Sequence, residues 1–498
     1  MKTTWLVTVA SVVLANAAWA GPAPEWRGYG GDEQHNAQAP VAAQSLAHLH
    51  WTTPVDLHPQ NQGGELLIHY AASMITAANT VLVPVKTGTS GGFRIEAHNG
   101  ATGALIWLRN SKYVLPPHDW TPSFPAHLTA QNNLVFAGPG GLVDERKTPD
   151  SAKGKEIELA FYGLANYKAD KAAYDANVMI STPLTADNAG DVYFGFVITG
   201  ATPANLSSGV ARITPDGKGT WISAGKAAKD SSMTEVAQNC APAISQDQST
   251  VYITISNGSS GYLVGLDSRT LKPKYRATLK DPSSGELAWV FDDSSASPTI
   301  GPDGDLYYGV LENPFPNHDD RGWLLHFDST LTKKKTPGSF GWDDTVSVVP
   351  ASAVPSYTGT SSYLLMTKYN NYYEGGPDGD GHNKIAILDP DATQQDEYSD
   401  ATVMKEILTI LGPTQYPGEP PGSVYEWCIN SAVVDPISQA VIANSEDGHV
   451  YVWSLVTNTL SQVLDLNLPE GEAYTTTIIG PDGTIYAVNN AQLYAIGN

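Results

Sequence analysis

One recurring unit makes up most of the chain, and this repeat limits the possible folds more than any other feature. Each copy has a polar or acidic cluster, a short strand beginning near Ser/Thr-Pro, a tight turn rich in Asp, Asn and Gly, and a second strand. A variable loop follows, then a third strand and often a fourth. In the clearest copy the first strand starts at Pro298, the turn covers residues 302–305, and strands follow at 306–310 and 323–327. Because these runs are β-branched or aromatic and end at turn residues, they indicate strands.

The unit occurs eight times. Eight small four-stranded sheets that cover their faces only against their neighbours predict an all-β, eight-bladed β-propeller. The first strands are expected at 72–77, 122–128, 183–185, 242–244, 298–300, 348–351, 431–434 and 475–479. The second strands are expected at 81–85, 134–137, 192–196, 251–255, 306–310, 363–367, 440–444 and 485–488.

The two ends of the chain predict how the ring closes. Residues 46–51 look like an outer strand without a repeat of its own, and the final repeat stops at its third strand, 493–497. If the N-terminal strand completes the last blade, the ring is sealed and a sheet edge disappears. We therefore expect residues 21–498 to form one propeller domain; the alternative is two stacked β domains with a break in the Pro-rich loop 412–422. Residues 170–176 are the one candidate for a short helix.

The first twenty residues predict a cleaved secretion signal. Lys2 supplies the positive charge, an apolar run follows from Trp5 to Leu14, and Ala18 and Ala20 give the small-x-small pattern of a cleavage site. The apolar run is too short to cross a bilayer, no later segment is long and apolar enough to do so, and no Cys follows the cleavage point to carry a lipid. The mature protein is therefore expected in the periplasm or outside the cell, without membrane insertion.

The chain is strongly acidic, with 51 acidic against 28 basic residues and a net charge of −23. Such a surface keeps an exported protein soluble, repels nucleic acid and anionic membranes, and attracts cations or cationic partners. We therefore expect a monomer that binds a small molecule and no nucleic acid.

A twelve-residue element resembles a known family. In residues 96–107, Ala97, Thr102, Gly103 and Trp107 resemble the Ala…Thr-Gly…Trp element of the propeller repeats of pyrroloquinoline-quinone (PQQ) enzymes, and 265–271 and 452–458 are weaker copies. The opening 26–36 is also similar to the start of such proteins. The Gly permits a tight turn, and the Trp can wedge between adjacent blades.

The resemblance implies the quinoprotein-like propeller fold but leaves the subfamily open. The family includes PQQ- and calcium-dependent alcohol dehydrogenases and cofactor-free propellers such as the outer-membrane assembly lipoprotein. The dehydrogenases stack the quinone against a disulfide between adjacent cysteines. This chain has only Cys240 and Cys428, lacks a CxxCH haem motif, and lacks the lipidated Cys of the lipoproteins. PQQ is therefore possible but not favoured, and fold alone does not define function.

Propeller geometry predicts where a site would lie. The entries to the first strands and the loops between second and third strands share one face, whereas the tight turns occupy the other. The first set is long and rich in ionisable groups, so we expect an acidic axial funnel on that face. His118, beside Asp119, is the best candidate for general acid/base work. The expected catalytic residues are His118, Asp119, Asp293, Asp344 and Glu426. The expected substrate-binding residues are His69, Tyr70, Trp120, Asn177, Arg321, Trp427, Glu472 and Tyr474. Alternatively, these residues cap strand ends and bind channel waters.

Two loops and the cysteines complete the expectations. Arg321 could hold a ligand carboxylate with its fork of donors, or form a salt bridge to Asp319 or Asp320. The loop 369–383 resembles calcium loops with alternating oxygen ligands, although Gly376 and Lys384 replace expected acids. The expected calcium ligands are Asp378, Asp380 and Asn383. In an oxidising compartment the lone pair Cys240 and Cys428 predicts a disulfide; two thiols or metal ligands are the alternatives.

Three functions follow. The first is a secreted propeller that binds or transforms a small polar substrate, a saccharide or a cationic compound. The second is an unusual PQQ- and calcium-dependent dehydrogenase. The third is a non-catalytic scaffold for envelope proteins.

Overall fold

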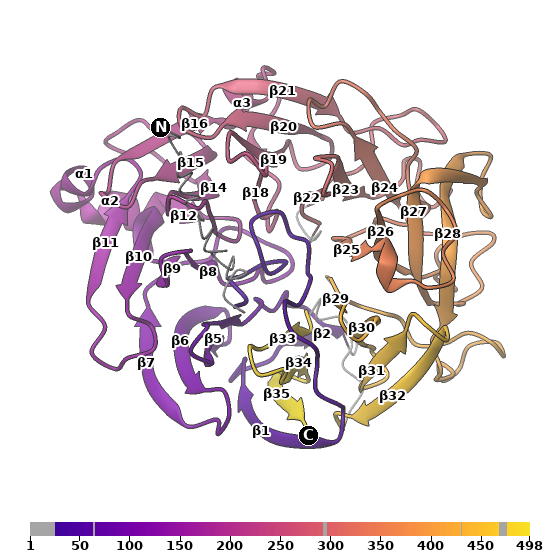
Figure 1. The fold of residues 1–498 in the computed structure, drawn as a ribbon. Helices are drawn as coiled ribbons and strands as arrows, with labels where there is room; N and C mark the ends of the chain where they lie inside the picture. Colours follow the sequence, from indigo (N-terminus) through magenta and orange to yellow (C-terminus); the bar gives the residue numbers. More distant parts are fainter. Residues whose placement is uncertain (1–24, 63–64, 292–295, 430, 468–475) are drawn as a thin grey trace, which may run out of the picture.

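The computed structural model describes residues 25–62, 65–291, 296–429, 431–467 and 476–498. Eight antiparallel sheets stand around a common axis as the blades of a propeller (Figure 1). This confirms the predicted fold class. The expected signal peptide, residues 1–20, lies outside the described residues. No helix among the described residues is long and apolar enough to cross a membrane.

Blades 1 to 4 follow one another along the first half of the chain, each with its first strand innermost. Blades 3 and 4 have a divided inner position, with two short strands pairing with the same second strand. The strands are β4 Met74–Ile75, β5 Thr80–Gly88, β6 Gly91–Asn99 and β7 Leu105–Ser111 in blade 1; β8 Ala126–Leu128, β9 Asn133–Ala137, β10 Leu142–Lys147 and β11 Glu156–Ala160 in blade 2; β12 Val178–Ile180, β13 Thr185–Ala186, β14 Val192–Ile198, β15 Gly209–Ile213 and β16 Gly219–Ser223 in blade 3; and β17 Glu235–Val236, β18 Ala243–Ile244, β19 Thr250–Ser256, β20 Gly261–Asp267 and β21 Pro273–Thr278 in blade 4.

Blades 5 to 8 complete the ring. Blade 5 has three named strands, and isolated bridges from Leu324 to Gly338 and from Phe327 to Lys334 mark its outer position. The strands are β22 Thr299–Ile300, β23 Leu306–Val310 and β24 Trp323–Phe327 in blade 5; β25 Ser347–Pro350, β26 Tyr363–Tyr369, β27 Lys384–Gln395 and β28 Thr402–Leu411 in blade 6; β29 Val433–Asp435, β30 Ala440–Asn444, β31 His449–Ser454 and β32 Thr459–Asp465 in blade 7; and β33 Ile478–Ile479, β34 Ile485–Asn489, β35 Gln492–Gly497 and β1 His48–Pro54 in blade 8.

The predicted closure is confirmed. β1 pairs antiparallel with β35, from His48 opposite Gly497 to Pro54 opposite Gln492, so the N-terminal strand is the outer strand of the last blade. The first and second strands of all eight repeats lie within or beside the predicted ranges. The Pro-rich loop 412–422 connects blades 6 and 7.

A few short elements lie outside the blades. The predicted helix is α2 Lys171–Asn177, and its N-cap Asp170 accepts a hydrogen bond from the Ala173 N–H at 3.2 Å. The remaining elements are β2 Asn61–Gln62, β3 Glu65–Leu66, α1 Leu164–Ala169, α3 Ala224–Ala227 and the 3-10 turns η1 Pro139–Gly141 and η2 Ala351–Ala353.

The core consists of apolar layers between blades, and the family-like element contributes to one of them. Trp107 of blade 1 is 7 % exposed, donates to the Pro149 carbonyl at 2.6 Å and lies 4.0 Å below the Arg146 guanidinium of blade 2. Gly103 has φ +70°, and a Cβ there would lie 2.6 Å from the Trp51 ring. Both expected reasons for the element, a Trp wedge and a Gly turn, are therefore confirmed.

The sequence did not predict the path of residues 26–39, which we call the axial segment. In Figure 1 this dark indigo chain crosses the middle of the ring. Its main-chain carbonyls accept hydrogen bonds from N–H groups near the ends of the first strands of six blades, at 2.7–3.0 Å. The donors and acceptors are Ile75 to Trp26, Leu128 to Arg27, Ile244 to Glu33, Ile300 to Gln34, Val348 to Asn36 and Val434 to Ala37. The segment therefore covers the axis where the tight turns begin, and the opposite, loop-rich face is where a site can open.

Candidate functional site

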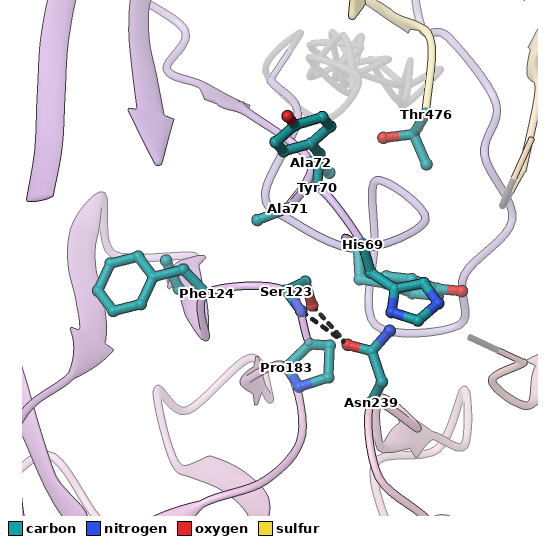
Figure 2. A pocket seen from close by; sticks show the side chains of 11 residues that line it. His69, Tyr70, Ala71, Ala72, Ser123, Phe124, Pro183, Asn239 and Thr476 are labelled. Carbon is teal, nitrogen blue, oxygen red and sulfur yellow. Dashed lines mark hydrogen bonds between the residues drawn. The ribbon is translucent and has the colours of Figure 1, made fainter. Parts of the chain in front are cut away.

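The described residues form a small cavity on the axis. Its volume is ≈ 20 Å³, which is room for about one water molecule. Figure 2 shows side chains that reach it from different blades: His69, Tyr70, Ser123, Asn239 and Thr476. The Asn239 carboxamide oxygen accepts hydrogen bonds from the Ser123 N–H at 3.2 Å and from its hydroxyl at 2.7 Å. Tyr29 of the axial segment also lines the cavity, so the axial segment takes up part of the space at the axis.

The predicted acid/base pair lies away from this cavity lining. His118 is half-buried, with Nδ1 2.6 Å from the Pro116 carbonyl oxygen, and Asp119 is exposed. Their neighbour Trp120 packs against His69 with ring centroids 5.6 Å apart. Three other predicted site residues, Asp293, Glu472 and Tyr474, lie outside the described residues.

Asp344 lies in a buried ionic cluster beside the axis. It is 1 % exposed, its carboxylate accepts the Thr367 hydroxyl at 2.5 Å, and the adjacent Asp343 pairs with the buried Lys368 ammonium. Burial raises the pKa of Asp344 to about 7, with Lys368 opposing that shift and Asp343 adding to it. Tyr29 bonds to Thr345 at 2.6 Å, and the Asp344 charge contributes to its raised pKa, which burial dominates. The structure thus places His69 and Asp344 near Tyr29.

Several predicted ligand-binding residues have structural contacts. Asn177 donates from its side chain to the carbonyls of Ala173 and Ala201, at 2.8 and 3.3 Å, at the end of α2. Trp427 is fully buried against Tyr451, and the half-buried Glu426 accepts hydrogen bonds at its main-chain carbonyl from the Glu446 N–H and the Ser445 hydroxyl.

Arg321 is also buried, contrary to the expectation of a ligand-binding guanidinium. It is 0 % exposed and donates to the carbonyls of Ser339, at 3.0 Å, and Asn370. Its guanidinium carbon lies 4.4 Å from the centroid of the Tyr369 ring and 4.5 Å from that of Tyr398. Among the described residues it forms no ion pair with Asp319 or Asp320. Through these contacts Arg321 holds the loop 311–322 against residues 339 and 370.

The expected calcium ligands are occupied by protein donors. Asp380 accepts from the Asn371 side chain at 2.7 Å and pairs with His382 at 2.7 Å, while the Asn383 carboxamide oxygen accepts the Asn371 N–H at 3.0 Å. Asp378 is exposed, and its N–H donates to Asp319 at 3.3 Å. No group of three or more His, Cys, Asp or Glu side chains in the described part of the chain is arranged to hold a metal ion. The loop is therefore an internally bonded turn, and calcium binding there stays a prediction.

The expected disulfide is wrong: both cysteines are buried and no bond joins them. Cys240 precedes the inner strand of blade 4 beside Thr254 and Tyr308, whereas Cys428 precedes blade 7 near Lys368. Two whole blades separate these entries around the ring, and this separation explains why the sulfurs do not meet. Burial raises the pKa of the Cys240 thiol to about 11.

A larger hollow lies off the axis, on the loop-rich face at blades 5 and 6. This aromatic pocket has a volume of ≈ 470 Å³. It is lined by Trp289, Phe291, Leu311, Phe315, Asp320 and Trp342. Sequence reasoning missed it because its walls come from three separate segments: the entry to blade 5, the loop after β23, and the entry to blade 6.

Main-chain hydrogen bonds hold these three segments together. Trp289 and Leu311 exchange N–H···O bonds of 3.1 and 3.2 Å, and the Trp342 N–H donates to the Arg321 carbonyl at 3.1 Å. The aromatic walls are continuous: the Trp289 and Phe291 centroids are 4.8 Å apart, and Phe291 meets Trp342 edge-on at 6.4 Å. The pocket is therefore a formed part of the fold.

Among the described residues that line the pocket, Asp320 is the one ionisable group. Burial raises its pKa to about 7, and the nearby Glu312 and Asp319 carboxyls add to the shift. Glu312 is fully buried and accepts the N–H groups of Asp320 and Gly322, at 2.9 and 2.8 Å. Asp319 and Asp320 both have positive φ angles, of 54° and 59°. A backbone in this region is strained for non-glycine residues and is found at functional sites.

The fold is that of the quinoprotein dehydrogenases. The structure resembles the quinohemoprotein alcohol dehydrogenase of Comamonas testosteroni, with TM-score 0.56 and 11 % identity over 97 % of this chain and 82 % of that one. A europium-containing methanol dehydrogenase gives TM-score 0.53 and 9 % identity, over 93 % and 89 % of the two chains. The quinohemoprotein alcohol dehydrogenase ADHIIG of Pseudomonas putida gives 0.52 and 11 %, over 95 % and 76 %.

At these identities the likeness shows the fold alone. No protein-family model matches the chain, and no curated protein does. The chain is thus a quinoprotein-like eight-bladed propeller whose function has to be argued from its own site.

Neither of these two cavities, as the described residues form them, fits PQQ, whereas the predicted funnel residues Asp293, Glu472 and Tyr474 lie outside the described part of the chain. This cofactor is a planar tricarboxylate, and the axial cavity of ≈ 20 Å³ has no room for it. The aromatic pocket is larger, but the ionisable group that its described lining presents is the Asp320 carboxylate, which would repel an anionic ligand.

Proposed function

We propose that this chain is a ligand-binding propeller that takes a small organic molecule into the aromatic pocket. The observation that carries the proposal is the pocket itself: ≈ 470 Å³ of space walled by two Trp and two Phe side chains with one carboxylate. Pockets for small molecules have about 300–1,000 Å³, mostly apolar walls and a few polar groups that orient the ligand.

The pocket supports this function better than the axis does. The axial segment covers one end of the channel, and Tyr29, His69 and Asn239 leave room there for about one water molecule. His118 and Asp119 do not line that cavity. Ligand binding is therefore assigned to the off-axis pocket, and the signal-like residues 1–20 lead us to propose that the ligand is met outside the cytoplasm.

A PQQ- and calcium-dependent dehydrogenase is the second candidate, and the fold of the dehydrogenases named above is what favours it. It makes a separate prediction. Purified protein mixed with PQQ and calcium should show a spectral shift and dye-linked alcohol oxidation. A flat spectrum and no oxidation would remove this candidate, and would leave the pocket proposal standing.

The pocket proposal is tested with N-phenyl-1-naphthylamine, an uncharged fluorescent probe for apolar sites. The probe should brighten on binding, and Phe291→Ala and Trp342→Ala should each weaken its binding by at least about tenfold, because each removes a whole aromatic wall. Tyr373→Ala is the matched control: this residue is an aromatic on the same face, is 40 % exposed and does not line the pocket. Equal binding by all four proteins, with unchanged circular dichroism spectra, would refute the proposal.

A further inference from the structure

We propose that the ligand of the aromatic pocket is a small organic cation of the alkylated ammonium type. This inference rests on the function proposed above and deepens it. The juxtaposition that carries it is a set of aromatic faces from three segments around one carboxylate that lacks a basic partner in the pocket lining.

The aromatic walls suit a cation with an apolar surface. The face of an indole or phenyl ring carries partial negative charge, and a cation within about 6 Å of the ring centroid is attracted to it. Trp289, Phe291 and Trp342 form a continuous row with centroid separations of 4.8 and 6.4 Å. Phe315, which is 55 % exposed, stands at the rim. An alkylated ammonium group can contact several such faces and loses less hydration on entry than a primary ammonium does.

The Asp320 carboxylate gives the pocket a negative charge, which is complementary to a cationic ligand. The six lining residues include no Lys, Arg or His, and no hydrogen bond or ion pair from the described residues reaches the half-buried Asp320 carboxylate. One of its oxygens, Oδ1, is buried without a partner. The neighbouring Arg321 does not neutralise it, because the guanidinium bonds to the Ser339 and Asn370 carbonyls instead. A buried carboxylate oxygen without a partner is costly, and a cationic ligand would supply that partner.

The same lining disfavours the other ligands considered for this chain. A saccharide carries several hydroxyl groups and needs several hydrogen-bonding partners, whereas the polar side-chain atoms of this pocket belong only to Asp320 and two indole N–H groups. The indole nitrogen of Trp289 is buried and has no acceptor in the described structure. An anion would meet the Asp320 carboxylate. The net charge of −23 also favours the approach of a cation.

The experiment compares ligands of equal shape and different charge. Choline, its uncharged carbon isostere 3,3-dimethylbutan-1-ol, and methyl β-D-glucoside are titrated against the bound N-phenyl-1-naphthylamine probe, at fixed ionic strength and pH 8, with calorimetry as a second measurement. We expect choline to bind at least about tenfold more tightly than its isostere, and the glucoside to bind most weakly. Asp320→Asn keeps the shape of the side chain and removes its charge, so it should lower the choline-to-isostere ratio severalfold. Tyr373→Ala should match the wild type.

The outcomes separate the two proposals. If the probe binds and the isostere equals or exceeds choline, the cation inference is overturned and the pocket function stands. Tighter binding of the glucoside would also overturn it. If neither the probe nor choline binds the folded wild-type protein, both proposals fail.

Discussion

The pH dependence of cation binding is the sharpest consequence of the pocket. The perturbation is a change from pH 8 to pH 5.5, which protonates Asp320. Burial first, and then the nearby Glu312 and Asp319 carboxyls, raise the pKa of Asp320 to about 7. Protonation removes the charge that the cation meets, so affinity should be highest above pH 7 and fall as pH falls. The aromatic walls carry no titratable group, and the raised pKa of Glu312 places its protonation in the same direction.

The size of the effect follows from the pKa of the free protein. If only the ionised carboxylate binds, affinity falls about tenfold for each pH unit below 7, and the ratio between pH 8 and pH 5.5 is about thirtyfold. The assay is the choline displacement titration, repeated every half unit at constant ionic strength. Asp320→Asn should bind weakly and show a flat profile. The reasoning is refuted if this variant keeps the wild-type pH profile, or if wild-type affinity rises as the solution becomes more acidic.

Three further predictions concern the frame that holds the pocket. The stability of Asp344→Asn relative to the wild type, measured by urea unfolding, should rise by about 2–3 kcal/mol from pH 5 to pH 8. The pKa of Asp344 is raised from 3.8 to about 7, so the folded wild type loses stability as pH rises through that range. A difference in stability that does not change with pH would contradict this. Cys240 and Cys428 should not react with a thiol reagent in the native protein, and two thiols should appear on unfolding without reductant; none would appear if the sulfurs were bonded. Trp26→Ala in the axial segment should cost about 3–5 kcal/mol because the side chain is 1 % exposed, and an unchanged urea midpoint would show that the segment does not hold the ring.

The blades could be predicted because their signals are local. A β-branched run, an Asp/Gly turn and a second run lie within about twenty residues, and each sheet uses consecutive strands, so the order of strands in space follows the order in sequence. The closing strand was predictable for a related reason: residues 46–51 had the pattern of an outer strand, and the last repeat lacked one. β1 and β35 pair as that argument required.

The site depended on longer-range information. Trp289 and Trp342 are 53 positions apart, and each taken alone reads as an ordinary packing residue; only the main-chain bonds to Leu311 and Arg321 bring their segments together. The burial of the Arg321 side chain could not be predicted either, because the sequence of a loop rich in His, Asp and Arg does not show which side chains point into the protein. Composition predicted carboxylates and aromatic rings around the axis, whereas the site proposed above combines the same kinds of group in the off-axis pocket.

The axial segment limits the space on the described part of the axis. Its carbonyls bond to first strands of six blades through the main chain, so no side-chain motif marks it in the sequence. It fills part of the centre of the ring among the described residues, and Tyr29 and His35 are buried there. Space for a ligand then has to come from the loops between second and third strands, which are free to differ in length. The loop 311–322 of blade 5 is long, is anchored from below by Arg321, and places Asp320 against aromatic side chains from two blade entries. The off-axis pocket is therefore a direct consequence of how the centre of this propeller is filled.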